Sequence, residues 1–115
     1  MTSGLDLEET NRDCDAVSRM SFIESDMAGF AEHAALKARP GTKWDYTSGN
    51  TMILSRIIRD AVGGHAGDVL AFARQELFEP LGMRNITLEF DAAGTPIPRD
   101  AFFASGLLGC WASVS

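Results

Sequence analysis

Residues 51–64 read TMILSRIIRDAVGG and contain the most regular apolar pattern of the chain. The three- and four-residue spacing of one helix face is shared by Ile53, Leu54, Ile57, Ile58 and Ala61. Gly63 and Gly64 supply the left-handed conformation that ends such a helix. The pattern predicts a helix from Thr51 to this glycine pair, with Arg56, Arg59 and Asp60 on the opposite face.

Two more helices are predicted on either side of this segment. Ser25 and Asp26 offer a capping residue and an acid ahead of apolar residues at helical spacing, and that helix should end before Pro40. Another helix should begin near Asp68 and end before Pro80. Three consecutive helices follow from these signals.

The remaining segments carry weaker signals. Residues 1–21 are polar and acidic without a sustained period, which indicates an irregular arm with at most one helical turn. Residues 85–90 alternate apolar and polar side chains, as in a short strand or extended run, and residues 91–96 have the composition of a turn. The apolar tail, residues 104–115, ends without a cap. We therefore predict a mainly α chain, with three or more helices and a short extended segment.

Composition places the chain among ordinary globular proteins and restricts its partners. The chain is 45% hydrophobic and 23% charged, and its 115 residues are enough for one domain with a single core. A net charge of −6 argues against a nucleic-acid partner, because no basic stripe exists to neutralise phosphates. No apolar stretch approaches the roughly 18 residues that span a bilayer, so no membrane segment is predicted. The sequence leaves the cellular compartment open.

Cysteine and histidine residues offer little chemistry. Cys14 and Cys110 match no metal-ligand spacing, and whether they pair stays open. His33 and His65 have no second ligand at helical spacing, which favours surface or helix-end positions. We therefore predict no metal site.

Residues 40–50 read PGTKWDYTSGN and form the clearest loop of the sequence. This loop contains Tyr46, the single tyrosine of the chain, with Ser48 two residues later. A phenol on a loop fixed against a rigid helix can donate, accept or, when cations lower its pKa from about 10, act as a base. The residues alone leave open a packed, hydrogen-bonded tyrosine and a catalytic one.

The apolar face of the helix that follows is expected to hold this loop in place. The anchoring residues would be Ile53, Leu54, Ile57 and Ile58. Truncation of Ile57 to alanine should then cost about 2–5 kcal/mol of stability, the range for a buried isoleucine.

Four segments, in order, resemble the serine β-lactamase-like superfamily. MTSGL at residues 1–5 resembles the segment after the nucleophile helix, and PGTKWDYTSGN resembles the Tyr-x-Asn/Ser region. LFEPLGM at residues 77–83 resembles a common family element, and GCWASVS at residues 109–115 resembles the glycine-led start of the next helix. The superfamily includes class C β-lactamases, penicillin-binding D-alanyl-D-alanine carboxypeptidases, esterases and 6-aminohexanoate-dimer hydrolases. The resemblance implies an α+β parent fold, of which residues 1–115 would be a partial domain, the central helical portion.

The resemblance also implies roles for individual residues. It places the family's catalytic tyrosine, which shuttles a proton between the attacking hydroxyl and the leaving group, on Tyr46. The third motif residue, usually asparagine, is Ser48, which keeps one hydrogen bond but lacks the second polar arm of an amide. This departure argues against a true β-lactamase and favours the esterase and 6-aminohexanoate-dimer hydrolase side, with Asn50 as an alternative amide. The implied substrate is a small-molecule amide, ester or lactam, cleaved through an acyl-enzyme without metal or organic cofactor.

Two parts of the family's machinery have no counterpart in the 115 residues. Neither lysine, Lys37 nor Lys43, has a serine three positions before it, so no Ser-x-x-Lys nucleophile motif occurs. No Lys/His-x-Gly strand follows the last helix. We therefore expect an internal piece of a serine hydrolase, truncated at both ends and inactive as the isolated chain. The alternatives are a small helical interaction module without catalysis and a helical domain whose resemblance is accidental.

Overall fold

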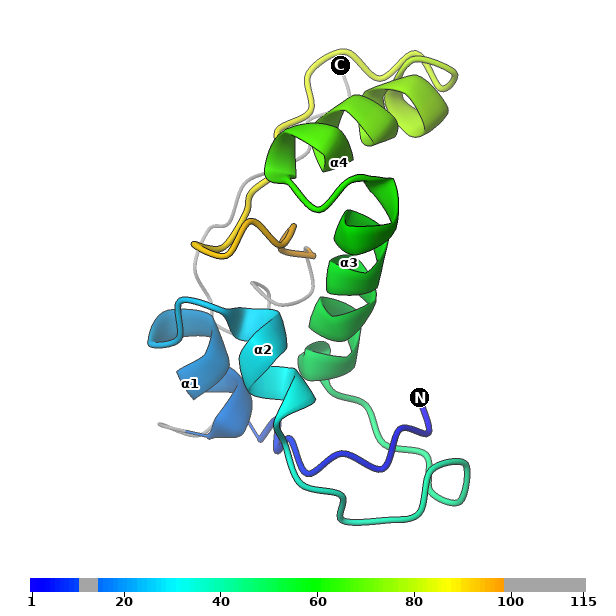
Figure 1. The fold of residues 1–115 in the computed structure, drawn as a ribbon. Coiled ribbons are helices and arrows are strands. Elements are labelled where there is room, and N and C mark those ends of the chain that lie inside the picture. The colour runs from blue at the N-terminus through cyan, green and yellow to red at the C-terminus, as the bar shows by residue number, and fades with distance from the viewer. Residues whose placement is uncertain (11–14, 99–115) are drawn as a thin grey trace.

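A computed structural model of the chain describes residues 1–10 and 15–98, and within them four α-helices follow an irregular N-terminal segment (Figure 1). The helices are α1 (Ala16–Phe22), α2 (Met27–Glu32), α3 (Ser48–Val62) and α4 (Ala66–Ala73), and the π-helical turn η1 (Arg74–Phe78) continues α4. The described residues contain no strand, only two isolated β-bridges. The mainly helical fold class is thus confirmed. No described helix has the length and apolar character needed to cross a membrane.

The long helix α3 connects two groups of elements (Figure 1). The helices α1 and α2 lie beside its first turns, and α4 with η1 lies beyond its last turn (Figure 1). The helix begins at Ser48, three residues earlier than predicted, so the end of the predicted loop is helical. It ends as predicted at a glycine pair, where Gly63 has a φ of 141° and Gly64 a φ of 90°.

The other two predicted helices are present, α2 shorter than predicted and α4 starting two residues earlier than predicted. The cap of α2 is Asp26, one residue later than the predicted capping residue Ser25, and its side chain accepts a hydrogen bond from the backbone N–H of Gly29 at 2.9 Å. The helix ends at Glu32, well before Pro40. The following helix starts at Ala66 and, through η1, ends at Phe78 ahead of the proline at position 80.

The N-terminal arm is more ordered than the sequence indicated. It contains α1, which is longer than the single turn expected. Asp15 begins this helix by accepting hydrogen bonds from the backbone N–H groups of Ser18 at 2.7 Å and Thr10 at 2.8 Å. Only Val17 and Met20 are buried on this seven-residue helix, and two residues are too few for a helical period to be recognised in the sequence.

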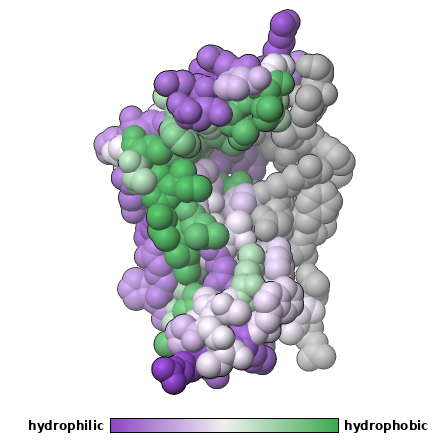
Figure 2. Space-filling model, turned by 90° about the vertical axis from the view of Figure 1, so that its right-hand side faces the viewer, coloured by the Kyte–Doolittle hydropathy of each residue, from purple (hydrophilic) through white to green (hydrophobic). Residues whose placement is uncertain are grey.

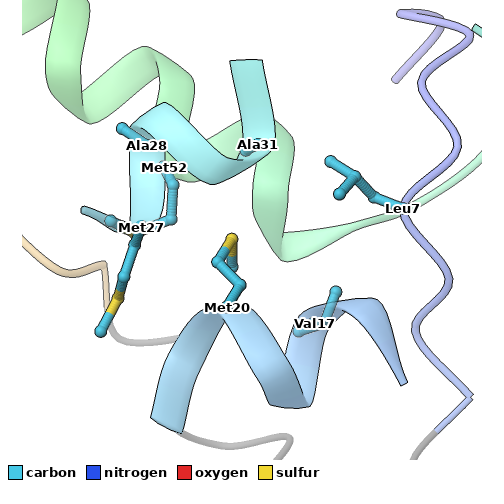
Figure 3. Close-up of a cluster of buried hydrophobic side chains, with 7 residues drawn as sticks. All are labelled: Leu7, Val17, Met20, Met27, Ala28, Ala31 and Met52. Atoms are coloured by element: carbon cyan, nitrogen blue, oxygen red, sulfur yellow. The ribbon is translucent and has the colours of Figure 1, made fainter. Parts of the chain in front are cut away.

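The main core lies where the N-terminal segment, α1, α2 and the first turns of α3 meet (Figure 3). It is made of Leu7, Val17, Met20, Met27, Ala28, Ala31 and Met52. Val17 and Met20 point from α1 toward α2, and Leu7 reaches in from the N-terminal segment (Figure 3). Three core residues therefore come from the arm that the sequence presented as irregular.

The predicted apolar face of α3 is not buried, which corrects the sequence interpretation. Leu54, Ile57 and Ile58 are 56%, 57% and 48% exposed. Their side chains belong to an apolar strip along α3, drawn in green in Figure 2. The expectation that these three residues anchor the Tyr46 loop was therefore wrong, although Ile53 does pack against the core.

The inward side of α3 carries the two arginines instead. The Arg56 side chain is 18% exposed and places Nη2 2.9 Å from each carboxylate oxygen of Asp26. The Arg59 side chain is 12% exposed and donates through Nη1 to the carbonyl oxygen of Ala93 at 2.8 Å. The orientation of α3 follows from these polar partners, which periodicity cannot reveal because they lie elsewhere in the sequence.

The turn predicted at residues 91–96 is confirmed, whereas residues 85–90 form no strand beyond a single bridge at Phe90. Phe90 and Pro96 form an isolated bridge around a turn in which the N–H of Gly94 donates to the carbonyl oxygen of Asp91 at 3.0 Å. The Asp91 carboxylate also accepts a hydrogen bond from the N–H of Met27 at 3.1 Å. This bond joins the turn to the start of α2.

Candidate active site

The loop between α2 and α3, residues 33–47, lies against the N-terminal segment (Figure 1). Four backbone hydrogen bonds of 2.7–2.9 Å join the two segments, each running from an N–H to a carbonyl oxygen. They are Asp6 to Ala35, Lys37 to Gly4, Gly41 to Thr2 and Asp45 to Met1. The loop that carries Tyr46 is therefore held along most of its length by residues 1–6.

Gly4 shows why the MTSGL segment requires a glycine. Its φ is 78°, a conformation that other residues rarely adopt. A Cβ atom at this position would also collide with the carbonyl oxygen of Ala38. Glycine thus allows the N-terminal segment to approach the loop closely.

Tyr46 lies at the surface, one residue before the N-cap of α3. Its side chain is 43% exposed. The next residue, Thr47, is buried and accepts a hydrogen bond from the N–H of Gly49 at 3.3 Å through its side chain. The predicted catalytic tyrosine is thus an exposed side chain on a stretch of backbone that enters a helix directly.

An ion pair lies immediately before Tyr46. Lys37 Nζ is 2.8 Å from an oxygen of the Asp45 carboxylate. The hydrogen bond from Lys37 lowers the pKa of Asp45, with help from the positive charge of Lys43 and against the effect of desolvation. The same hydrogen bond raises the pKa of Lys37. Both groups therefore remain charged at neutral pH, and the pair joins the first half of the loop to its end.

Ser48 lies inside the protein rather than at the surface. Its side chain is 0% exposed, and its hydroxyl donates a hydrogen bond of 3.0 Å to the carboxylate of Glu9. The backbone N–H of Ser48 donates to the other oxygen of that carboxylate at 2.7 Å. The structure therefore separates the two predicted site residues, with Tyr46 outside and Ser48 inside, and Thr47 between them.

Asn50, the alternative amide, lies in the first turn of α3. Its side-chain nitrogen is 3.7 Å from the sulfur of Met1, a weak donor–acceptor contact. This contact keeps the amide beside the N-terminal segment.

Glu9 is the residue of this region that the sequence analysis missed. It belongs to an acidic stretch that resembles an ordinary solvated surface, and 39 positions separate it from Ser48. No local pattern connects two residues so far apart. A buried hydroxyl needs a hydrogen-bond partner, so the only indication in the sequence was that Ser48, if buried, would need such a partner.

A pocket of about 420 Å³ lies elsewhere, between residues 6–7, α1 and α2. Its lining includes Glu24 and Asp26 but neither Tyr46 nor Ser48. Both of these carboxylates are paired with arginines. The pocket is therefore not part of the candidate site.

The histidines occupy the helix ends that the sequence predicted. His33 follows α2 and His65 precedes α4, and both are exposed. His33 Nδ1 lies 2.6 Å from the carbonyl oxygen of Gly29. In residues 1–10 and 15–98, no three side chains of His, Cys, Asp or Glu form a group able to hold a metal ion. Cys14 and Cys110, and the GCWASVS segment at residues 109–115, lie outside the described residues.

The chain is similar to a known protein family. The family model described as Beta-lactamase matches residues 1–104. No curated protein and no solved structure matches the chain. The matched range includes the N-terminal segment, the Tyr46 loop and all four described helices. The chain therefore belongs to the Beta-lactamase family.

Proposed function

We propose that the chain is part of a serine hydrolase that cleaves a small-molecule amide, ester or lactam through an acyl-enzyme, with Tyr46 as the proton shuttle. The observation that carries this proposal is the placement of Tyr46. Its phenol is exposed on a loop that the N-terminal segment holds in place, and the whole arrangement lies within the range matched by the family. A proton-transfer residue requires a fixed position within hydrogen-bond reach of the reacting groups and access to the substrate.

The phenol would take part in two proton transfers. As the nucleophilic serine attacks the carbonyl carbon, the phenolate oxygen takes the hydroxyl proton, and the phenol then returns this proton to the leaving group. A phenolate needs nearby positive charge, because its ordinary pKa is about 10. Ser48, buried against Glu9, would support this chemistry by fixing the start of α3 and would not touch the substrate.

The isolated 115-residue chain is proposed to be inactive, since its sequence has no Ser-x-x-Lys nucleophile motif. Purified chain should therefore hydrolyse neither nitrocefin nor p-nitrophenyl esters above the buffer rate. Turnover that appears in the purified chain and disappears in Tyr46→Phe would overturn this part of the proposal.

The role of Tyr46 is testable in a longer protein. Sequencing of the flanking DNA should reveal an open reading frame with Ser-x-x-Lys upstream of residue 1. In that protein, Tyr46→Phe should lower kcat by about 10²–10⁴-fold, the usual contribution of a positioned acid–base group. Trp44→Phe is the matched control, because Trp44 is an exposed aromatic on the same loop. Equal activity of Tyr46→Phe and the parent would contradict the assignment.

A small helical interaction module is the alternative, favoured by one observation. The exposed apolar side chains of α3 would suit a partner surface, since contiguous apolar patches often mark interfaces. Stop codons at both borders of the coding segment would favour this alternative over the hydrolase.

A further inference from the structure

Glu9 binds the first residue of α3 with both of its carboxylate oxygens. Oε2 accepts the backbone N–H of Ser48 at 2.7 Å, and Oε1 accepts the Ser48 hydroxyl at 3.0 Å. Hydrogen bonds to a charged acceptor are stronger than neutral ones. The carboxylate also lies at the positive end of a 15-residue helix, where a negative charge is favourable.

The neighbouring residue Leu7 fixes the same turn by packing. A Cβ atom at Gly49 would collide with the Leu7 side chain, so the first turn of α3 lies directly on this leucine. Leu7 itself is a buried member of the core. The N-terminal segment thus contacts two successive residues of α3, by a hydrogen-bonded carboxylate at Ser48 and by van der Waals contact at Gly49.

Tyr46 lies between two attachments to the N-terminal segment. On one side, the N–H of Asp45 donates to the carbonyl oxygen of Met1 at 2.9 Å. On the other side, Ser48 is bound to Glu9. Only Tyr46 and Thr47 separate these attachments. The direction of the Tyr46 side chain therefore depends on the position of Ser48.

We propose that Glu9 is a positioning residue for Tyr46, acting through its two hydrogen bonds to Ser48. The inference rests on the proposed function, because it takes Tyr46 as the residue that must be held in place. Glu9 does not touch the substrate. It fixes the helix start so that the backbone before it presents the phenol outward in one orientation.

The test uses the order of Tyr46 in the full 115-residue chain and does not require activity. Tyr46 is the only tyrosine, so its ring gives a single set of resonances in an aromatic ¹H–¹³C spectrum. Amide hydrogen exchange at Ser48 reports the Glu9 bond directly. Exchange at Met52, whose side chain is fully buried, serves as the measure of global stability.

Three variants separate geometry from charge. Glu9→Ala removes both hydrogen bonds, and Ser48 exchange should become about tenfold faster while the Tyr46 ring signals shift toward those of an unfolded chain. Glu9→Gln removes the charge but can keep both bonds, because its carbonyl accepts the Ser48 N–H and its NH₂ donates to the Ser48 hydroxyl. The exchange rate of the Ser48 amide in this variant should stay within about threefold of the rate in the parent. Glu8→Ala is the matched control, since Glu8 is an exposed carboxylate one position away.

The outcomes decide the proposal in every case. Unchanged Tyr46 signals in folded Glu9→Ala would overturn it, whether or not Ser48 exchange becomes faster. If Glu9→Ala unfolds, amide exchange will accelerate equally at Met52 and Ser48, and Glu9→Gln then decides. Tyr46 signals like those of the parent in Glu9→Gln would support positioning by hydrogen bonds. Disordered Tyr46 signals in Glu9→Gln would overturn it. Full activity of Tyr46→Phe in the longer protein would remove the proposed function but leave this result on loop order intact.

Discussion

The two ends of α3 contrast in how their apolar residues are used. At the first end, Met52 lies in a core built with α1, α2 and the N-terminal segment (Figure 3). At the second end, Ile57 and Ile58 lie on the surface, and the neighbouring α4 and η1 leave Phe72 and Leu77 about half exposed as well. Toward its second end, α3 is therefore covered only on the arginine side, where Arg59 contacts Ala93 and Thr95, and its apolar strip is left open.

The contrast shows that apolar character does not by itself determine burial. The N-terminal segment and α1 cover the beginning of α3, whereas no described element covers its apolar strip (Figure 2). The candidate site lies at the covered end, where Glu9 binds Ser48 and Leu7 lies against Gly49. Rigid packing and the proposed chemistry thus coincide in one part of the molecule.

Truncation at the covered end should have the largest effect. Met52→Ala removes a fully buried side chain between helices and should lower the free energy of unfolding by about 2–5 kcal/mol. Urea denaturation followed by circular dichroism measures this change. Leu54→Ala, two residues away on the exposed side, is the control and should change stability by no more than about 0.5 kcal/mol. Equal losses in both variants would contradict the contrast between the two faces.

Elements with local signals could be predicted from the sequence. Asp26 marked the start of α2, and the glycine pair at positions 63 and 64 marked the end of α3, because caps and positive φ values depend on residues close in sequence. The orientation of α3 could not be predicted. It depends on Asp26 lying opposite Arg56, 30 positions away, and periodicity contains no information about such partners.

The candidate site was predictable to a similar extent. Tyr46 was identified because a family motif surrounds it, and that motif is a local feature. The hydrogen bonds between Glu9 and Ser48 could not be predicted, because the two residues come together only when the chain folds. The burial of Ser48 follows from the same long-range contact.

The ion pair between Asp26 and Arg56, at the middle of α3, should make a smaller and pH-dependent contribution to stability. Burial raises the pKa of Asp26, but the hydrogen bond from Gly29 and the interaction with Arg56 outweigh it, so the pKa is lowered in the folded protein. A lowered pKa stabilises the fold above the unfolded value of about 3.9 and loses this contribution as the pH falls through the lower, folded-state value. The Asp26 side chain is partly exposed, so the gain at neutral pH should be about 0.5–1 kcal/mol.

Asp26→Asn tests this linkage, because asparagine retains the ability to cap α2. The free energy of unfolding, measured by urea titration at several pH values, should fall less steeply below about pH 4 in the variant than in the parent. Parallel profiles for the two proteins would show that Asp26 does not contribute to acid unfolding.

The smallest effect is expected at the open end, from Ile57→Ala. Ile57 is more than half exposed, so its truncation removes little packing, and alanine has the higher helix propensity. The change in unfolding free energy should stay within about 0.5 kcal/mol, far below the 2–5 kcal/mol of a buried isoleucine. Ile53→Ala is a matched comparison in the same helix, since Ile53 packs against the core, and it should cost distinctly more.

The same pair of variants becomes more informative in a longer protein. If additional chain covers the strip of α3, Ile57→Ala should approach the cost of a buried isoleucine there while remaining near zero in the 115-residue chain. Ile53→Ala should change little between the two proteins, because its partners are already present. A difference confined to Ile57 would assign the open end of α3 to contacts within the larger hydrolase, and the absence of any difference would favour the interaction module.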